Sequence, residues 1–459
     1  MRHVLAIVAV VACSGGAPPP ATPVKTAVDR DPEGPHRAAI AQQMQPMIDA
    51  ELASAIVVGL YDAGKLEIYG FGKGPNGAPP TGRTIFELGA VTKVYTALLL
   101  ADSIQRREVA LDTPAGELLP PGVTAPVRDK QVITLHHLVN HSSGLPPLPP
   151  SVVAKANVSD PLAGYDDSRL YADLVQTQLV ALPGERIQIS EYGSGLLGHL
   201  LGRKIGTDYA EAIEARVTKP MGFRDTFLAV PADAAARRAQ GTDQDLVAVK
   251  PWSWGVLAGA GGLLSSVRDQ LKLIDAELDG AAGSKQALRP AMRFTQEAQL
   301  QGAGANMGLA WQIDRDGRYW HNGTTNGFHA FVGFDVKARR GIVILAASAT
   351  PLIDQVSIRF YKILAGEAVP APKVPTAAQL AMYAGTYDFA GSALKMVADG
   401  KRLYVEGPGE PRIRMLPISD REFWIHSLQA IVVFQEDGGK IVRAVFIVGD
   451  QQMAAPRKD

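Results

Sequence analysis

The chain has 459 residues, of which 46% are hydrophobic and 20% charged, and its 46 basic residues equal its 46 acidic residues in number. This balance is typical of a soluble globular protein with room for more than one domain. The formal net charge is zero, so the chain creates no long-range attractive field. The composition therefore argues against a nucleic-acid partner and against electrostatic binding to an anionic membrane.

The N-terminus carries an export pattern. Arg2 and His3 precede a short apolar run over residues 4–12, which ends at the chain's only cysteine, Cys13. The small residues before Cys13 resemble a bacterial lipobox, in which the cysteine is lipidated after cleavage. A plain secretory signal with an incidental cysteine is the alternative. The run is too short to span a bilayer, so we expect an exported lipoprotein, periplasmic or on the outer surface, that touches the membrane only through its lipid.

Strands are predicted at both ends of a helical middle part. An apolar period of three to four residues from Arg37 predicts a helix, and residues 55–61 and 66–72 flank a tight turn and predict a pair of strands. A proline-punctuated block over 110–185 contains short helical segments. Further predicted segments are a helix over 90–106, a helix over 195–205, and strands over 307–314, 318–321, 328–335 and 341–346.

One helical segment carries the first motif. Residues 86–107 read FELGAVTKVYTALLLADSIQRR. This resembles the S-x-x-K helix of serine β-lactamases and penicillin-binding proteins, with Lys93 one turn after the nucleophile position. Ala90 occupies the position of the nucleophilic serine. A methyl group cannot attack a carbonyl, and loss of such a nucleophile costs on the order of a million-fold in turnover.

A second motif is altered as well. Residues 183–198 align without a gap to the family segment that carries Y-x-N, and they place Ile189 on the tyrosine and Glu191 on the asparagine. Isoleucine has no proton to transfer, so the proton shuttle is missing together with the nucleophile. Tyr192 would replace it only through a register slip that breaks the match at residues 196–198. Glu191 either pairs with Lys93 or turns outward to water, and the sequence leaves both open.

The third motif is retained. His321, Asn322, Gly323 and Thr324 resemble the H-x-G variant of the family's K-T-G strand. The resemblance implies that Gly323 permits close approach of a ligand and that the backbone NH groups of Ala90 and Thr324 form an oxyanion hole. His321 is then either a general base or a polar residue that lines the cleft.

Other chemically interesting residues have simpler interpretations beside the functional one. Ser190 is a weak reserve nucleophile between two altered motif positions. Trp252 and Trp254 precede a segment that resembles the cleft edge of the family, where they either wall a ligand pocket or simply pack. His137 and His141 share a predicted helical face, but their segment resembles the family's helix and turn rather than a metal site, and we expect no metal and no cofactor.

The resemblance covers residues 37–366 and implies an α/β (α+β) sandwich with a helical subdomain. Short β-like runs beyond it predict a small antiparallel β-barrel, similar to the lipocalin-like tail of many β-lactamase-related proteins. We expect this tail to be structural or to contact a protein partner. The expected boundaries are 1–13 for the signal, 14–36 for a flexible linker, 37–366 for the β-lactamase-like domain, 367–375 for a second linker and 376–450 for the barrel.

Two functional hypotheses follow. In the first, the chain is an envelope homologue of a serine hydrolase (β-lactamase, DD-carboxypeptidase or esterase) that has lost covalent catalysis. It retains a cleft for a peptidoglycan peptide, a β-lactam-like ligand or a protein partner. In the second, it hydrolyses esters, amides or β-lactams with a different nucleophile or with a water held by Glu191.

Overall fold

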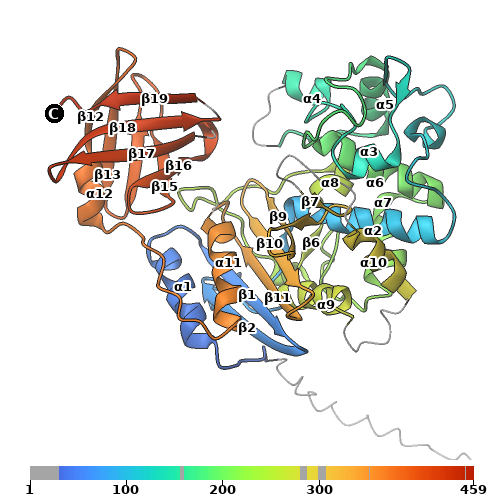
Figure 1. Ribbon diagram of the computed structural model, residues 1–459, viewed down its shortest axis with the longest axis horizontal. Helices are drawn as coiled ribbons and strands as arrows, with labels where there is room; N and C mark the ends of the chain where they lie inside the picture. Colours follow the sequence, from blue (N-terminus) through green and yellow to red (C-terminus); the bar gives the residue numbers. More distant parts are fainter. Residues whose placement is uncertain are drawn as a thin grey trace, which may run out of the picture.

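The computed structural model describes residues 30–155, 160–279, 287–297, 306–350, 352–428, 430–449 and 451–459. The expected signal, Cys13 and most of the first linker lie outside these residues. Figure 1 shows three parts: a central sheet with helices on its faces, a helical subdomain on one side and a C-terminal barrel on the other. Within the described residues, no helix is both long and apolar enough to cross a bilayer.

The central sheet has seven strands in the order β2-β1-β11-β10-β9-β8-β7, and all neighbours are antiparallel. Strands from both ends of the domain meet in its middle, where Val57 of β1 pairs with Leu345 of β11. The strands are β1 (Ala55–Asp62), β2 (Lys65–Gly72), β7 (Asn306–Met307), β8 (Gln312–Ile313), β9 (Tyr319–Thr324), β10 (His329–Asp335) and β11 (Arg340–Ala346).

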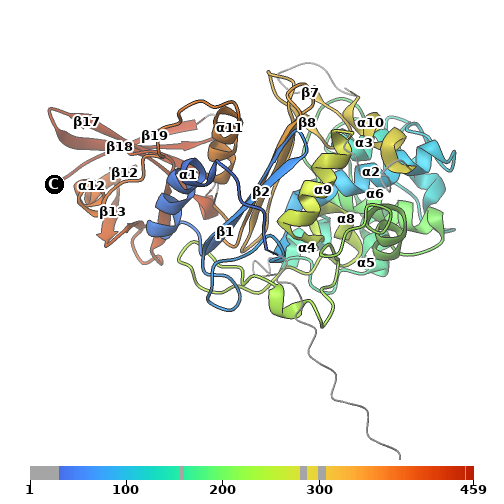
Figure 2. The ribbon, with the colours of Figure 1, turned by 90° about the horizontal axis from the view of Figure 1, so that it is seen from below.

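Helices cover both faces of this sheet, and Figure 2 shows them on either side of it. Alternate residues of β1 enter different cores: Ile56 and Val58 pack with α1 (Arg37–Asp49) and α11 (Leu352–Leu364). Val57 faces the larger core that contains α2 (Thr92–Gln105) and α9 (Val267–Glu277). The period of two along a strand is what places these neighbours on opposite faces.

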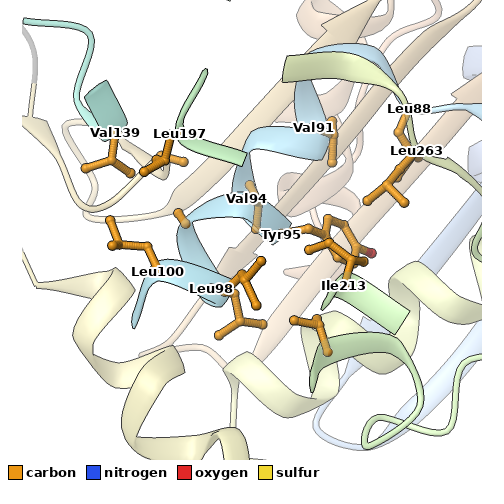
Figure 3. Close-up of a cluster of buried hydrophobic side chains, with 14 of the residues drawn as sticks. Leu88, Val91, Val94, Tyr95, Leu98, Leu100, Val139, Leu197, Ile213 and Leu263 are labelled. Atoms are coloured by element: carbon orange, nitrogen blue, oxygen red, sulfur yellow. The ribbon is translucent and has the colours of Figure 1, made fainter. Parts of the chain in front are cut away.

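The helix α2 is the centre of the larger core. Residues 92–103 are all buried, and Figure 3 shows its apolar side chains surrounded by those of neighbouring segments, including Leu197 and Leu263. A helix that is buried all round is held by packing on every side rather than on one stripe. The N-terminal end of α2 is therefore a rigid platform for whatever lies there.

The helical subdomain surrounds α6 (Glu191–Ile205), which starts four residues before the predicted beginning at residue 195. The Ser190 hydroxyl accepts a hydrogen bond from the Gly193 NH at 2.9 Å and caps this helix. The remaining helices and short strands are α3 (Leu135–Val139), α4 (Pro150–Lys155), α5 (Asp167–Gln176), α7 (Tyr209–Ile213), α8 (Ala258–Gly261), α10 (Arg289–Gln296), β3 (Phe86–Glu87), β4 (Val127–Arg128), β5 (Gln131–Val132) and β6 (Leu264–Ser265).

One predicted strand is split. Residues 307–314 form the ends of β7 and β8 with a turn between them, in which Ala310 has φ +63° and the Gly308 NH donates to the Trp311 carbonyl. The indole of Trp311 is fully buried in the larger core. Burial of this side chain directs the chain inward, so the apolar run that predicts one strand belongs to a turn and two short strands.

The C-terminal part is an eight-stranded antiparallel sheet in simple sequence order. A bridge from Tyr387 to Arg457 brings its first strand beside its last, so the barrel is nearly closed. Stacked and edge-to-face aromatic rings fill its interior, with Tyr383 of α12 (Ala377–Tyr383) 4.4 Å from Phe434 between ring centroids. The strands are β12 (Gly385–Phe389), β13 (Ser392–Asp399), β14 (Arg402–Glu406), β15 (Ile413–Pro417), β16 (Glu422–Ile425), β17 (Ala430–Asp437), β18 (Lys440–Val448) and β19 (Gln451–Pro456).

We predict that Gly198→Ala destabilises the protein, because α6 and α8 touch through glycines. A Cβ at Gly198 would lie 2.9 Å from the Gly259 Cα and 3.0 Å from the Tyr209 ring. The expected loss in the free energy of unfolding is about 1–3 kcal/mol, measured by urea denaturation. Gly116→Ala is the matched control, because its nearest new contact is the Ala125 Cβ at 3.8 Å and the expected change is within about 0.5 kcal/mol. Equal effects of the two changes would contradict the packing argument.

Candidate functional site

The N-terminal end of α2 meets the strand β9 through backbone atoms. Ala90 lies in a short 3-10 turn (Gly89–Val91) that leads into α2, and its side chain is partly exposed. A Cβ on Gly323 would lie 2.6 Å from the Ala90 nitrogen, and one on Gly89 would lie 3.0 Å from the Thr324 nitrogen. Only glycine lets the two segments come this close. The two amides that the sequence predicts as oxyanion donors therefore belong to segments in backbone contact.

A partly buried ion pair stands beside Ala90. Lys93 Nζ lies 2.8 Å from Glu191 Oε1, and the exposed fractions of the two side chains are 6% and 28%. Glu191 is the first residue of α6, where a carboxylate also interacts favourably with the helix dipole. The structure thus answers the question that the sequence leaves open: Glu191 faces Lys93 and neutralises its charge.

Two histidines complete the surroundings of Lys93, and both are neutral near pH 7. Burial and, secondly, the charge of Lys93 lower the pKa of His321 to about 4. The same causes, in the same order, lower the pKa of His141 to about 3. His321 Nδ1 lies 2.6 Å from the Asn322 carbonyl, and His141 Nδ1 accepts a hydrogen bond from the Ser190 NH at 3.3 Å. His141 is a site neighbour that sequence reasoning assigns only to a turn.

The other two residues of the third motif face the opposite side of the sheet. Asn322 Nδ2 donates to Asp354 Oδ2 at 2.7 Å. The Thr324 hydroxyl lies 2.9 Å from His329 Nδ1, and His329 Nε2 lies 2.8 Å from Asp354 Oδ1. Asp354 belongs to the first turn of α11. Asp354 lies outside every motif that the sequence singles out, and its only signal is the usual preference for an acidic residue in a first helical turn.

Comparisons with known proteins agree with this geometry. A family model described as Beta-lactamase matches residues 37–366. The chain belongs to the β-lactamase family. It is 24% identical over 280 residues to a β-lactamase of Pseudomonas fluorescens, with 60% of this chain and 74% of the relative covered. It is 26% identical over 259 residues to the D-alanyl-D-alanine-carboxypeptidase/endopeptidase AmpH of Escherichia coli, with 53% and 64% covered.

Solved structures show the same fold. A class C β-lactamase from Rhodobacter sphaeroides superposes with a TM-score of 0.61 at 26% identity, over 71% of this chain and 98% of that one. A D-alanine carboxypeptidase AmpC from Burkholderia cenocepacia superposes with a TM-score of 0.62 at 24% identity, over 72% and 98%. The predicted family and the predicted α/β sandwich with a helical subdomain and a C-terminal barrel are confirmed.

In this β-lactamase-family chain, the residues near the second motif have structural roles. Ser190 is 1% exposed, and its hydroxyl donates to the Pro146 carbonyl at 2.7 Å while it caps α6. Ile189 is 65% exposed, so its side chain projects into solvent. Tyr192 is fully buried in the larger core, where burial raises the pKa of its phenol. The structure does not bring Ser190 or Tyr192 to an open position beside Ala90.

The two predicted cleft tryptophans belong to a different cavity. Trp252 and Trp254 meet edge to face with 6.0 Å between ring centroids, and both line a cavity of about 990 Å³. His199 and Arg203 of α6 also line it, whereas Lys93, Glu191 and His321 are absent from its described lining. The tryptophan pair and the ion pair are therefore parts of two separate places in the fold.

We predict a pH dependence of stability from His321. In the unfolded chain its pKa is about 6.5, so as pH falls the unfolded state takes up the proton before the folded state does. Stability contributed by the neutral imidazole is present above pH 6.5 and is lost as the pH falls towards 4. His321→Gln should reduce this loss by up to about 3 kcal/mol, measured as urea unfolding free energies between pH 7 and 4. Parallel curves for the two proteins would contradict the pKa direction.

Proposed function

We propose that this chain is an exported β-lactamase-family protein that has lost serine acyl transfer and binds its ligand without a covalent bond. The observation that carries the proposal is the pair of Ala90 and the neutralised Lys93. The position predicted for the nucleophile holds a methyl group, and the neighbouring amine lies 2.8 Å from a carboxylate instead of standing free as a base.

The retained backbone geometry supports a binding role. Gly323 keeps β9 in contact with the Ala90 amide, and main-chain NH groups can donate to a ligand carbonyl whatever the side chains are. One relative is named as a D-alanyl-D-alanine-carboxypeptidase/endopeptidase, so its substrates are peptides that contain D-alanine. We therefore propose a peptidoglycan-like peptide as the ligand, with a β-lactam-like molecule or a segment of a protein partner as the other occupants to test.

The proposal places the protein in the bacterial envelope, held there by a lipid on Cys13. Its support is the N-terminal pattern of a charged start, an apolar run and a lone cysteine. The barrel takes part as a structural or protein-contact module through its outer surface, because aromatic side chains fill its interior. Residues 367–375 connect it to the binding domain in this scheme.

Hydrolysis by another group is the competing function, and the contacts support it less well. A nucleophile must reach the substrate carbonyl, and Ser190 is buried with its hydroxyl bonded to Pro146. A water-activating base must be free to take up a proton, and Oε1 of Glu191 is engaged by Lys93 while its Oε2 is buried. Turnover of a small chromogenic ester that disappears in Glu191→Gln would favour this function over the proposed one.

We predict that the wild-type protein and Ala90→Ser both fail to form an adduct with a fluorescent penicillin, read by gel fluorescence and intact mass. The double variant Ala90→Ser/Glu191→Asn should form the adduct at a rate at least about tenfold above the detection limit that bounds Ala90→Ser, because it frees Lys93 to assist the new hydroxyl. It should remain slow, because Ile189 supplies no phenol.

The control for this experiment is Glu191→Asn alone, which lacks a nucleophile and should stay unlabelled. A stable adduct on the wild-type protein would overturn the proposed loss of acyl transfer. Equal rates for the single and the double variant would show instead that the ion pair does not silence Lys93.

We also predict that a stem peptide ending in D-Ala-D-Ala amide binds reversibly and that Gly323→Val abolishes the binding, measured by isothermal titration calorimetry. The new side chain would collide with the Leu88 carbonyl and the Ala90 amide, 2.1 and 2.6 Å from its Cβ. Gly116→Val, at a glycine whose nearest new contact is the Ala125 Cβ at 3.8 Å, is the control for folding and should retain binding.

A further inference from the structure

We propose that the cavity lined by the tryptophan pair, α6 and α7 is a binding site for a short oligosaccharide of pyranose rings. This inference goes beyond the proposed function and does not depend on it, because the cavity has its own lining and lies apart from Lys93. Its volume of about 990 Å³ is at the upper end of the range of about 300–1,000 Å³ that small-molecule sites occupy. A cavity of this size has room for more than one sugar ring.

The two indole rings supply the apolar surface of the site. Trp252 and Trp254 both line the cavity, and their ring planes meet at 64° with 6.0 Å between centroids. Both side chains stay partly exposed, so apolar ring surface is left for a ligand. A Cβ on Gly261 would lie 2.3 Å from the Trp254 ring, so the bare backbone of this glycine makes room for the indole.

The segment that carries the two rings is tied to its surroundings. Ser253 lies between the tryptophans, and its NH and its hydroxyl donate to the two carboxylate oxygens of Asp160 at 2.9 and 2.7 Å. Two residues after Trp254, the Val256 NH donates to the Tyr165 carbonyl at 3.2 Å. The rings are therefore positioned before a ligand arrives, which lowers the entropic cost of binding.

Three carboxylates supply hydrogen-bond acceptors at the same cavity. Asp166 accepts the Arg169 NH at 3.0 Å and Asp208 accepts the Glu211 NH at 2.8 Å, so each caps a helix through its Oδ1. Among the described contacts, the Oδ2 atoms of these two residues accept no hydrogen bond. Asp167 follows in the lining, with 62% of its side chain exposed. The helix caps fix the carboxylates and leave oxygens for the hydroxyls of a ligand.

A guanidinium of α6 supplies hydrogen-bond donors. Arg203 lines the cavity, and only one of the five NH donors of a guanidinium is its Nε–H, which is directed at the Leu118 carbonyl at 3.3 Å. Arg238 also lines the cavity, but it forms an ion pair with Glu87 at 2.9 Å. The indole surface is therefore surrounded by both acceptors and donors, with three carboxylates against one guanidinium.

This combination favours a sugar over other classes of ligand. A pyranose ring carries apolar C–H groups on its faces and hydroxyls at its edge, and each hydroxyl both donates and accepts. Its face can stack on an indole while its edge reaches the carboxylates and the guanidinium. An anion would be repelled by the excess of carboxylates. A quaternary ammonium ion is attracted by carboxylates and indole faces, but it has no donor for the carboxylates and fills only part of the cavity.

The test titrates the full chain with cellotriose and with N-acetylchitotriose at pH 7. Binding is followed by intrinsic tryptophan fluorescence and by isothermal titration calorimetry. We expect a dissociation constant below about 1 mM for at least one of the two sugars. It should change less than about twofold between about 0.05 and 0.5 M sodium chloride, because the ligand is uncharged.

Two variants locate the sugar. Trp254→Ala should weaken its binding at least about tenfold by removing stacking surface. Asp167→Ala should weaken it about three- to tenfold by removing an acceptor, and its exposed position keeps this test available if Trp254→Ala does not fold. Trp424→Ala on β16 and Asp437→Ala on β17 are the matched controls and should leave binding unchanged. Circular dichroism melting checks that each variant is folded.

Each other outcome overturns the inference. If neither oligosaccharide binds, the cavity is not a sugar site, while peptide binding beside Ala90 stands or falls by its own titration. Equal affinity in the wild-type protein, Trp254→Ala and Asp167→Ala would place the sugar elsewhere. Benzyltrimethylammonium is titrated in parallel: if it binds more tightly than both sugars and salt weakens its binding, the cavity is a cation site instead.

Discussion

The ion pair between Lys93 and Glu191 is the interaction on which the site depends. It joins the first turn of α2 to the first residue of α6, two helices whose side chains are otherwise buried among apolar neighbours. Lys93 is buried and Glu191 is partly exposed, so removal of Glu191 would leave the Lys93 charge buried without a counter-ion, which is costly in stability. The pair therefore ties the chemistry of the site to the stability of the helical core. The same contact places a carboxylate 2.8 Å from the Lys93 amine.

The contact between the turn before α2 and the strand β9 is made by backbone atoms and not by the side chains of the motifs. Gly89 and Gly323 bring the turn before α2 against β9, and no side-chain substitution at Ala90 changes that approach. An arrangement of main-chain amides is set by packing of the helix and the sheet, so it persists when a nucleophile is replaced. A chain can therefore match the β-lactamase family over residues 37–366 with an alanine at position 90.

Two other features lie outside the site around Lys93: the cavity that the two tryptophans line and the C-terminal barrel. The cavity that Trp252 and Trp254 line lies apart from the ion pair, with its own polar residues from α6. The barrel is attached to the sheet domain by contacts such as the hydrogen bond from Tyr404 to Asp245 and the ion pair of Arg402 with Glu51. Because its interior is a core of aromatic rings, its surface is what remains for contact with other molecules.

Much of this architecture follows from local sequence. The period of apolar residues predicts α1 and the strands at both ends of the domain, and the resemblance to the β-lactamase family implies that Lys93, Glu191 and His321 lie in one site. The split into the two short strands β7 and β8 is not predicted from the local pattern, because burial of Trp311 overrides the strand pattern. The position of Trp252 and Trp254 is not predicted either, because a motif's place in the chain does not fix which cavity its side chains enter.

The sequence by itself determined that position 90 carries a methyl group and position 189 carries no phenol, because a residue's chemical groups are set by its identity alone. Only the tertiary structure decided that Glu191 turns towards Lys93, 98 positions away, and that Asp354 engages Asn322, 32 positions away. Contacts at such separations depend on how the helices pack on the sheet, which no local pattern records. The surroundings of Lys93 are therefore a property of the fold.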